Sequence, residues 1–288
     1  MQKPAVLFLR LVMWFFQILP ERAAFGLGRF IGVFWFHVTR FRRGLIISNL
    51  TQAFKGEKSP REIRRIARDN LVHYGLMFAE WNRIPILPDE YFRKRIVFSG
   101  KERMDEALKR GKGVIALCGH YGCWDMMAIG QAMAGVNAHI ITKHAKSRAV
   151  DVVWQEVRES KGVRFLPAEY AALQLWKLLK TNQVLGIIFD QSRPGPMGIR
   201  VNFFGRPAKT MKLVAMLALR TGCAVVPINN WRDERMVHHV ECGAELPLIR
   251  KDTEDDSILA NTQLYNDTLE SFIRQHPEQW LWIHRRWK

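Results

Sequence analysis

Short apolar runs alternate with amphipathic segments through most of this chain, and the alternation limits what the chain can fold into. Apolar runs of this length, bounded by turn residues, are typical of strands buried on both faces of a sheet. The strand candidates lie at residues 114–118, 138–142, 184–189, 224–228 and 237–241. The helical patterns lie at residues 126–134, 147–160, 170–180, 209–220 and 258–275. We therefore predict a single α/β domain with a mixed, mostly parallel sheet flanked by helices.

An earlier helix is predicted to begin after Ser59. A proline follows at the first helical position and Glu62 stands three residues after the serine, which is a capping-box pattern. The apolar periodicity then continues to about Trp81. Arginines recur largely opposite the apolar face, at positions 61, 64, 65 and 68. Such a run is typical of a solvated helix face, and an anion-binding role is the alternative.

Residues 1–40 form the most apolar part of the chain. Two stretches, 4–20 and 23–39, have few polar interruptions and are followed directly by arginines. Each is slightly shorter than the ~20 residues that span a bilayer, and no small-residue cleavage site follows the first. A pair of buried core helices is one interpretation. We favour an N-terminal membrane-associated helical segment at 1–40, spanning or interfacial, followed by the main domain at 41–288, because apolar residues with a basic collar suit an anionic leaflet.

The chain is strongly basic, with 44 Lys and Arg against 27 Asp and Glu and a formal net charge of +17. This charge predicts an anionic partner, such as a membrane surface, an acidic protein or nucleic acid. No nucleic-acid-binding motif accompanies the charge, so we expect no nucleic-acid partner. The 4 cysteines form no CxxC pair, which fits a reducing compartment rather than a disulfide scaffold.

The segment most informative about chemistry is GKGVIALCGHYGCWD, at residues 111–125. A predicted strand ends at Cys118, His120 lies in the loop that follows, and Asp125 lies in the first turn of the next predicted helix. Catalytic groups gather at the carboxyl ends of strands in such sheets. We expect the Asp125 carboxylate to approach His120 and hold one ring nitrogen protonated, which leaves the other nitrogen free as a general base.

Other interpretations of this segment remain open. His120 could simply cap the following helix. Cys118, His120, Cys123 and Asp125 could ligate zinc, although their spacing matches no common zinc pattern and we expect no metal. A serine hydrolase would need a G-x-S-x-G elbow, which the segment lacks.

The heptapeptide GHYGCWD resembles the H-x4-D/E motif of the glycerolipid acyltransferase superfamily. Four further segments narrow the resemblance to the late acyltransferases of lipid A biosynthesis. They follow the family's order and are RRGLIISNL, FDQSRPGP, FFGRPAKT and PEQWLWIHRRWK. Asp125 stands where many members have Glu, and Cys123 stands where Asn is common.

The resemblance implies an enzyme at the cytoplasmic face of the bacterial inner membrane. It would transfer a fatty acyl chain from an acyl carrier protein thioester to a hydroxyl of an anionic glycolipid acceptor. Acyl-CoA is the alternative donor, and no metal or organic cofactor is expected. An acyltransferase of the same superfamily that acts on a lysophospholipid or another membrane lipid is the alternative function. The absence of an E-G-T-R-type segment favours the lipid A-like branch.

The resemblance also implies substrate-binding residues. Arg158 matches an arginine that the family uses near the acceptor's anionic head group, although a charge at a helix C-terminus would explain it as well. Asp190 and Gln191 follow a predicted strand and would line the cleft, or merely cap the strand. Lys209 and Thr210 lie at a predicted helix N-terminus, which could bind an oxyanion or phosphate, or belong to a surface loop.

Overall fold

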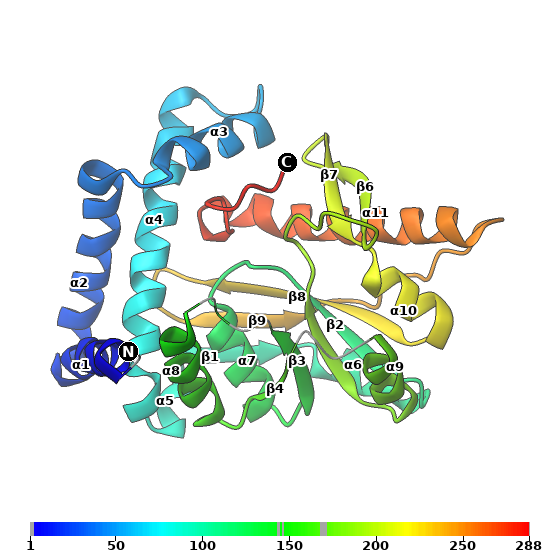
Figure 1. Cartoon of the computed structure of the whole chain (residues 1–288), viewed down its shortest axis with the longest axis horizontal. Coiled ribbons are helices and arrows are strands. Elements are labelled where there is room, and N and C mark those ends of the chain that lie inside the picture. Colours follow the sequence, from blue (N-terminus) through cyan, green and yellow to red (C-terminus); the bar gives the residue numbers. More distant parts are fainter. Residues whose placement is uncertain (1–2, 143–144, 146, 168–171, 288) are drawn as a thin grey trace.

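The computed structural model describes residues 3–142, 145, 147–167 and 172–287, and its centre is a seven-stranded sheet (Figure 1). The strands of this sheet are β1 (Ile96–Ser99), β2 (Val114–Cys118), β3 (Ala138–Thr142), β4 (Arg164–Pro167), β5 (Val184–Ile188), β8 (Ala224–Arg232) and β9 (His238–Cys242). Their order is β1-β9-β8-β2-β5-β3-β4. The pairing is parallel except between β8 and β9. The predicted α/β class and mostly parallel sheet are confirmed.

Helices cover both faces of the sheet. They are α1 (Lys3–Ile18), α2 (Glu21–Phe34), α3 (Arg43–Ala53), α4 (Pro60–Arg83), α5 (Asp89–Arg95), α6 (Lys101–Lys109), α7 (Trp124–Met133), α8 (Arg148–Glu159), α9 (Ala172–Lys180), α10 (Leu213–Thr221) and α11 (Glu254–Gln275). Every residue of β2 is apolar because both faces of this strand are buried. Ile115 and Leu117 pack into the core beneath α10 and α11, whereas Val114 and Ala116 pack into the core beneath α6 and α7.

Helix α4 joins the N-terminal helices to the sheet. It begins as predicted, because the Ser59 hydroxyl accepts from the Glu62 amide and the Glu62 carboxylate accepts from the Ser59 amide. Helix α2 packs closely along α4, and a Cβ added to Gly28 would lie 2.6 Å from the carbonyl oxygen of Gly75. The N-terminal helices are therefore packed onto the α/β domain at one end of the molecule (Figure 1).

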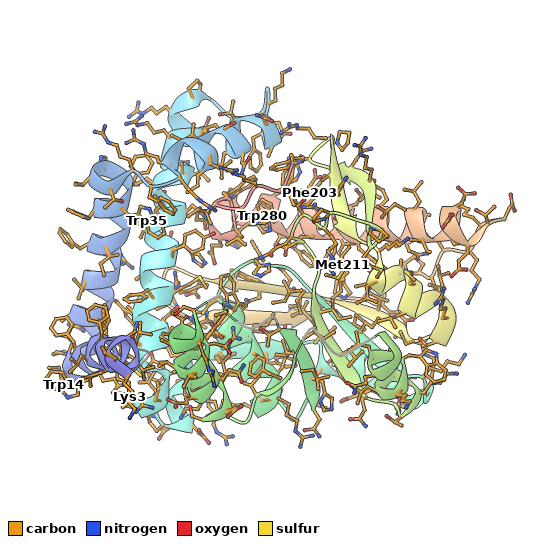
Figure 2. All side chains as sticks on the ribbon, viewed as in Figure 1. Lys3, Trp14, Trp35, Phe203, Met211 and Trp280 are labelled. Carbon is orange, nitrogen blue, oxygen red and sulfur yellow. The ribbon has the colours of Figure 1, made fainter. Side chains whose placement is uncertain are left out.

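The outer surface of the N-terminal helices is apolar and exposed. Figure 2 shows Trp14 projecting from α1 at the edge of the molecule. The exposed large apolar side chains of residues 3–41 are Leu7, Phe8, Leu11, Trp14, Phe15, Ile18, Phe30, Val33, Phe34, Val38 and Phe41. Within the described residues, no helix is both long and apolar enough to cross a bilayer. The predicted membrane segment folds as α1, α2 and a short π-helix η1 (Trp35–Thr39).

One predicted helix is partly wrong. The segment FFGRPAKT, residues 203–210, lies in an antiparallel hairpin of β6 (Gly198–Phe203) and β7 (Arg206–Met211), and α10 begins only at Leu213. Lys209 and Thr210 therefore lie in a strand and not at a helix N-terminus. Thr210 faces inward and is fully buried, as alternation along β7 requires.

The C-terminal segment, residues 276–287, lies between α4 and the β6–β7 hairpin (Figure 1). Trp280 and Trp282 are among the most buried side chains, and Trp280 packs against Phe203 of β6 with ring centroids 5.3 Å apart. Buried indole rings stabilise a fold strongly, because each removes a large apolar area from water. This segment also supplies contacts to the candidate site.

Candidate active site

His120 and Asp190 meet at the carboxyl ends of two neighbouring parallel strands. In the register of β2 and β5, Cys118 pairs with Ile188. His120 and Asp190 each follow two residues after these partners, so the two loops leave the sheet side by side. Ligand-binding and catalytic groups commonly collect at such a position.

The Asp190 carboxylate contacts His120 twice. Its Oδ1 lies 2.6 Å from Nδ1 of the His120 ring, and its Oδ2 accepts from the His120 backbone amide at 2.8 Å. Oδ2 also accepts from Nε1 of Trp280 at 2.8 Å. Burial alone would raise the pKa of Asp190, but the electrostatic interaction with His120 and the hydrogen bonds from His120 and Trp280 outweigh it and lower that pKa. Asp190 is therefore held as a carboxylate that accepts the Nδ1 proton of His120.

The other ring nitrogen of His120 faces the accessible side of the site. The His120 side chain is 21% exposed, whereas Asp190 behind it is 1% exposed. Nε2 of His120 lies 3.2 Å from Nε2 of Gln191, which is an exposed residue. With Nδ1 protonated, Nε2 accepts this amide hydrogen bond and carries the lone pair that a base needs.

Asp125 has a different partner from the expected one. Its carboxylate accepts from Nε of Arg158 at 2.6 Å, and both side chains are almost fully buried. The Arg158 guanidinium also lies 3.7 Å from the ring centroid of Trp154 and 4.8 Å from that of Phe165. We expected Asp125 to orient the His120 ring. In the structure the carboxylate at Nδ1 of His120 belongs to Asp190. Asp125, in the first turn of α7, instead balances the charge of Arg158 on α8.

The C-terminal segment and β8 hold the loop that carries His120. The His120 carbonyl accepts from the Leu281 amide at 3.1 Å, and the Gly122 amide donates to the Gln279 carbonyl at 3.0 Å. The Tyr121 carbonyl accepts from the side chain of Asn230 at 3.0 Å. Gly122 has φ +63°, and a Cβ there would lie 2.8 Å from the carbonyl carbon of Asn230. Glycine is therefore required at the turn by both its backbone angle and its close neighbour.

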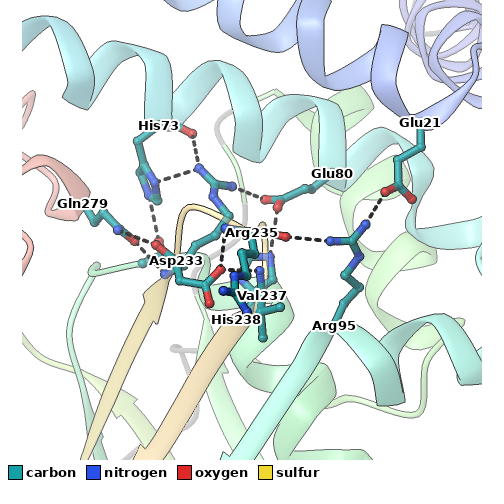
Figure 3. A network of polar contacts seen from close by, with 11 residues as sticks. Glu21, His73, Glu80, Arg95, Asp233, Arg235, Val237, His238 and Gln279 are labelled. Carbon is teal, nitrogen blue, oxygen red and sulfur yellow. Dashed lines mark hydrogen bonds and ion pairs between the residues drawn. The ribbon is translucent and has the colours of Figure 1, made fainter.

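A buried polar network lies behind the same loop and joins α4 to the sheet (Figure 3). Nε2 of His73 lies 3.3 Å from the Gly122 carbonyl oxygen, and an Arg232 nitrogen lies 3.0 Å from Nδ1 of His73. Arg232 also donates to Glu80 at 2.6 Å, and Glu80 contacts Nε2 of His238 at 2.9 Å. Because a guanidinium only donates, Nδ1 of His73 accepts, and Nε2 carries the proton that bonds Gly122.

Burial and opposite charges shift the pKa values inside this network. Burial and the neighbouring Arg232 lower the pKa of His73 to about 3. Burial would raise the pKa of Glu80, but the charges of Arg232 and His238 outweigh it and lower the pKa to about 2. His73 is therefore neutral and Glu80 ionised near neutral pH, as the hydrogen-bond directions require.

Two of the substrate-binding candidates lie in the hairpin. The Lys209 carbonyl accepts from the Arg286 guanidinium at 2.8 Å, and the Thr210 hydroxyl accepts from the same guanidinium at 2.6 Å. Asn266 also contacts the Thr210 hydroxyl. These contacts use Thr210 to anchor the C-terminal segment, so the structure does not bring its side chain to His120.

The two cysteines of the motif are buried. The Cys118 thiol donates to the Ala116 carbonyl at 3.5 Å. Burial raises the pKa of both Cys118 and Cys123 well above the ordinary thiol range. Both side chains pack among the apolar residues of the core, so they fit a structural role better than a metal site.

Several residues around the site were not found from the sequence. Trp280, His73 and Arg232 come from the C-terminal segment, α4 and β8, far from His120 along the chain. A histidine and a glutamate seven residues apart on one predicted helix share a face, which was the available signal for His73 and Glu80. Their partner Arg232 carried no comparable signal.

His120 contacts a buried carboxylate at the carboxyl ends of two parallel strands. This arrangement occurs in hydrolases and acyl-transfer enzymes, where the histidine acts as a base. The chain matches the family described as "Bacterial lipid A biosynthesis acyltransferase" over residues 3–288, almost its whole length. It belongs to this family and is an acyltransferase, which confirms the resemblance read from its motifs.

Relatives of this chain carry two kinds of name. The chain is 25% identical to lipid A biosynthesis acyltransferase 2 of Shigella flexneri, over 89% of this chain and 80% of the relative. It is 24% identical to the lipid A biosynthesis myristoyltransferase of Escherichia coli (strain K12), over 89% and 77%. It is also 25% identical to a phosphatidylinositol mannoside acyltransferase of Mycobacterium tuberculosis (strain CDC 1551 / Oshkosh), over 76% and 69%. All three names describe acylation of a glycolipid.

Proposed function

We propose that this protein transfers a fatty acyl chain from an acyl carrier protein thioester to a hydroxyl of a lipid A-type glycolipid, with His120 as the general base. The observation that carries this proposal is the contact between Nδ1 of His120 and the buried Asp190 carboxylate, which leaves Nε2 toward the accessible side. Such a nitrogen can accept a proton from a bound hydroxyl.

The proposed reaction needs no nucleophile from the protein. Nε2 of His120 takes the proton of the acceptor hydroxyl as its oxygen attacks the thioester carbonyl carbon. Asp190 stabilises the imidazolium that forms. The tetrahedral intermediate then collapses, the carbon–sulfur bond breaks, and the imidazolium returns the proton to the leaving thiolate. The products are an O-acylated lipid and a free thiol.

Asp125 and Arg158 have a supporting role in this proposal. Their buried ion pair fixes the first turn of α7, immediately after the loop that carries His120. Because Arg158 is 9% exposed at its side chain and is bonded to Asp125, we propose that it orders the site more than it clamps the acceptor. Gln191, exposed beside Nε2 of His120, is the better candidate for touching the acceptor hydroxyl.

The donor is proposed from charge. A net charge of +17 suits an acidic carrier protein. Acyl-CoA is the alternative donor, because its phosphates also make it anionic. Transfer assays with the same acyl chain on the two donors distinguish them. The proposal requires the carrier thioester to have the higher kcat/KM, and a preference for acyl-CoA would contradict it.

The acceptor is proposed from the relatives. The lipid A enzymes of Shigella and Escherichia and the phosphatidylinositol mannoside enzyme of Mycobacterium share a sugar-bearing lipid in their names. We therefore expect a glycolipid hydroxyl, and a lysophospholipid acceptor would contradict this part of the proposal. Mass spectrometry of lipids from cells with and without the protein identifies the acceptor and acyl chain together.

We further propose that the enzyme lies on the cytoplasmic face of the inner membrane by its N-terminal helices. The exposed apolar side chains of α1 and α2 support an interfacial position, because they face away from the core. Flotation of the purified protein with lipid vesicles tests this attachment. Absence of binding to any vesicle would contradict the location without contradicting the acyl-transfer chemistry.

A further inference from the structure

A basic surface pocket lies beside the N-terminal helices, apart from the polar groups around His120. It has a volume of about 470 Å³ and lies between η1 and the first half of α4. Its lining is Phe36 and His37 from η1, with Glu62 and four arginines from α4, which are Arg61, Arg64, Arg65 and Arg68.

The pocket continues the groove in which α2 packs. Positions 61, 64, 65 and 68 follow helical spacing, so their side chains share one stripe of α4. Farther along the same stripe, α2 makes its close contacts, where Gly28 faces Gly75 and Gly32 faces Val72. The chain turns away at η1, and the arginines occupy the part of the stripe that α2 leaves uncovered.

The four arginines repel one another, and the described residues offer them little compensation. The only carboxylate in the lining, Glu62, accepts two hydrogen bonds from Ser59 in the capping box. Arg68 pairs with its neighbour Asp69. Across the described part of the chain, no carboxylate forms a salt bridge with the other three arginines of the pocket. Like charges at this spacing destabilise a helix, so an arrangement of this kind favours an anionic ligand.

The ring of Phe36, in the pocket lining, holds the guanidinium of one of these arginines. The guanidinium of Arg64 lies 5.6 Å from the ring centroid of Phe36, and that of Arg43 lies 5.3 Å from the same centroid. Phe36 itself is 1% exposed and anchored in the main core. Arg43 lies outside the pocket lining, so the ring reduces the freedom of one pocket guanidinium, that of Arg64, before a ligand arrives.

The surroundings of the pocket identify the source of the anion. Val38 is 60% exposed and Phe41 is 59% exposed in the segment beside the pocket, and Phe34 and Phe30 continue the apolar surface along α2. Apolar residues that enter a bilayer next to arginines at headgroup level are typical of interfacial helices. The pocket is also of the size that holds a small ligand rather than a protein surface.

We propose that this pocket binds the phosphodiester headgroup of an anionic phospholipid in the membrane on which the enzyme rests. The inference depends on the proposed membrane-bound acyltransferase and adds a specific lipid site to it. Helix α4 also carries His73, which contacts the loop of His120 through the Gly122 carbonyl. A lipid bound at the first half of α4 would therefore fix the orientation of the active site relative to the membrane.

The test measures binding of the full chain to vesicles of phosphatidylcholine alone and of phosphatidylcholine mixed with phosphatidylglycerol. The test variant replaces Arg61, Arg64, Arg65 and Arg68 with Gln. The control removes the same net charge from the far end of the molecule by replacing Lys109, Arg110, Lys180 and Arg220, at the C-terminal ends of α6, α9 and α10, with Gln (Figure 1). A third variant replaces the four pocket arginines with Lys.

The pocket variant should lose about 10²- to 10³-fold in partitioning onto the anionic vesicles, and the control much less. Binding to neutral vesicles should stay unchanged in both, because the apolar surface is intact. The Lys variant should recover only part of the loss, since an ammonium cannot fork onto phosphate oxygens. Removal of like charge should leave the melting temperature of the pocket variant unchanged or raised. A lowered melting temperature would therefore reveal a misfolded variant.

Three results would overturn the inference. The pocket variant could bind anionic vesicles like the wild type, or the control could lose as much, which would indicate diffuse attraction. The pocket variant could instead lose affinity for an acidic carrier protein alone, which would make the pocket a protein-docking site. Acyl transfer in detergent tests the proposed function separately, because detergent-dispersed acceptor needs no vesicle binding.

Discussion

Oδ1 of Asp190 lies 2.6 Å from Nδ1 of His120, although the two residues are 70 positions apart in the chain. The contact arises because β2 and β5 are hydrogen-bonded neighbours that end at the same level of the sheet. Nε2 of His120 is thereby left on the accessible side, beside Gln191.

The buried pair of Asp125 and Arg158 should contribute to stability more than to acceptor binding. Arg158→Ala leaves a buried carboxylate without its partner, which costs roughly 3–5 kcal/mol in the free energy of unfolding. The loss should lower kcat through disorder of α7 as well as raise KM. Denaturant unfolding of Arg158→Ala, Asp125→Asn and the double variant measures the coupling between the two residues. Additive losses would show that the pair is not coupled.

His73 should make stability depend on pH below neutrality. The folded pKa of about 3 is lower than the ordinary 6.5, so the unfolded chain binds a proton that the folded chain does not. Stability from this group is complete above about pH 6.5 and is lost as pH falls toward about 3, with a slope of about 1.4 kcal/mol per pH unit.

Unfolding measured across this pH range tests the prediction. His73→Gln preserves an amide donor toward Gly122 but removes the titrating ring, so it should flatten the slope. His239→Gln is the matched control, because His239 lies at the surface of β9 and contacts Asp233. An unchanged slope in His73→Gln would contradict the assignment.

The exposed apolar residues of α1 should attach the protein to membranes without contributing to the fold. Deleting residues 1–40 is a poor test, because Phe16, Ala24 and Phe25 are buried against α4 and their loss would expose its core. Phe8→Ser with Trp14→Ser changes only exposed side chains, at 65% and 57%. This pair should reduce binding to neutral vesicles several-fold with no change in melting temperature.

Leu259→Ser and Val97→Ser provide a control for that experiment. These side chains are also exposed, on α11 and β1, but lie outside the N-terminal helices. Equal loss of vesicle binding in this pair would show that the membrane surface has been assigned to the wrong elements.

The local elements could be predicted because their signals are local. Val114–Cys118 and Ala138–Thr142 are strands at the predicted bounds, and the helix after Ser59 begins with the predicted capping box. Apolar runs and caps depend on neighbours within a few residues, which a single sequence displays. The same holds for the position of His120 and Asp190 in loops at strand ends.

The partners of the site residues depend on strand order, which the sequence does not display. Strand β5 is inserted between β2 and β3, so a loop late in the chain lies against His120. The prediction chose Asp125 because it was the nearest carboxylate along the chain. The wrong helix start at Lys209 and Thr210 has a related cause, since the short strands of the hairpin are stabilised by α11 and the C-terminal segment rather than by their own pattern.

The most direct test of the account is the turnover number of Asp190→Asn, measured with saturating donor thioester and glycolipid acceptor. An amide in place of the carboxylate neither fixes the Nδ1 proton nor stabilises the imidazolium, so kcat should fall by about 10²- to 10⁴-fold, as in His120→Ala. The acceptor KM should change little, because the carboxylate is buried behind the ring. Near-full kcat in Asp190→Asn, with the loss confined to Asp125→Asn, would contradict the account and return the orienting role to Asp125.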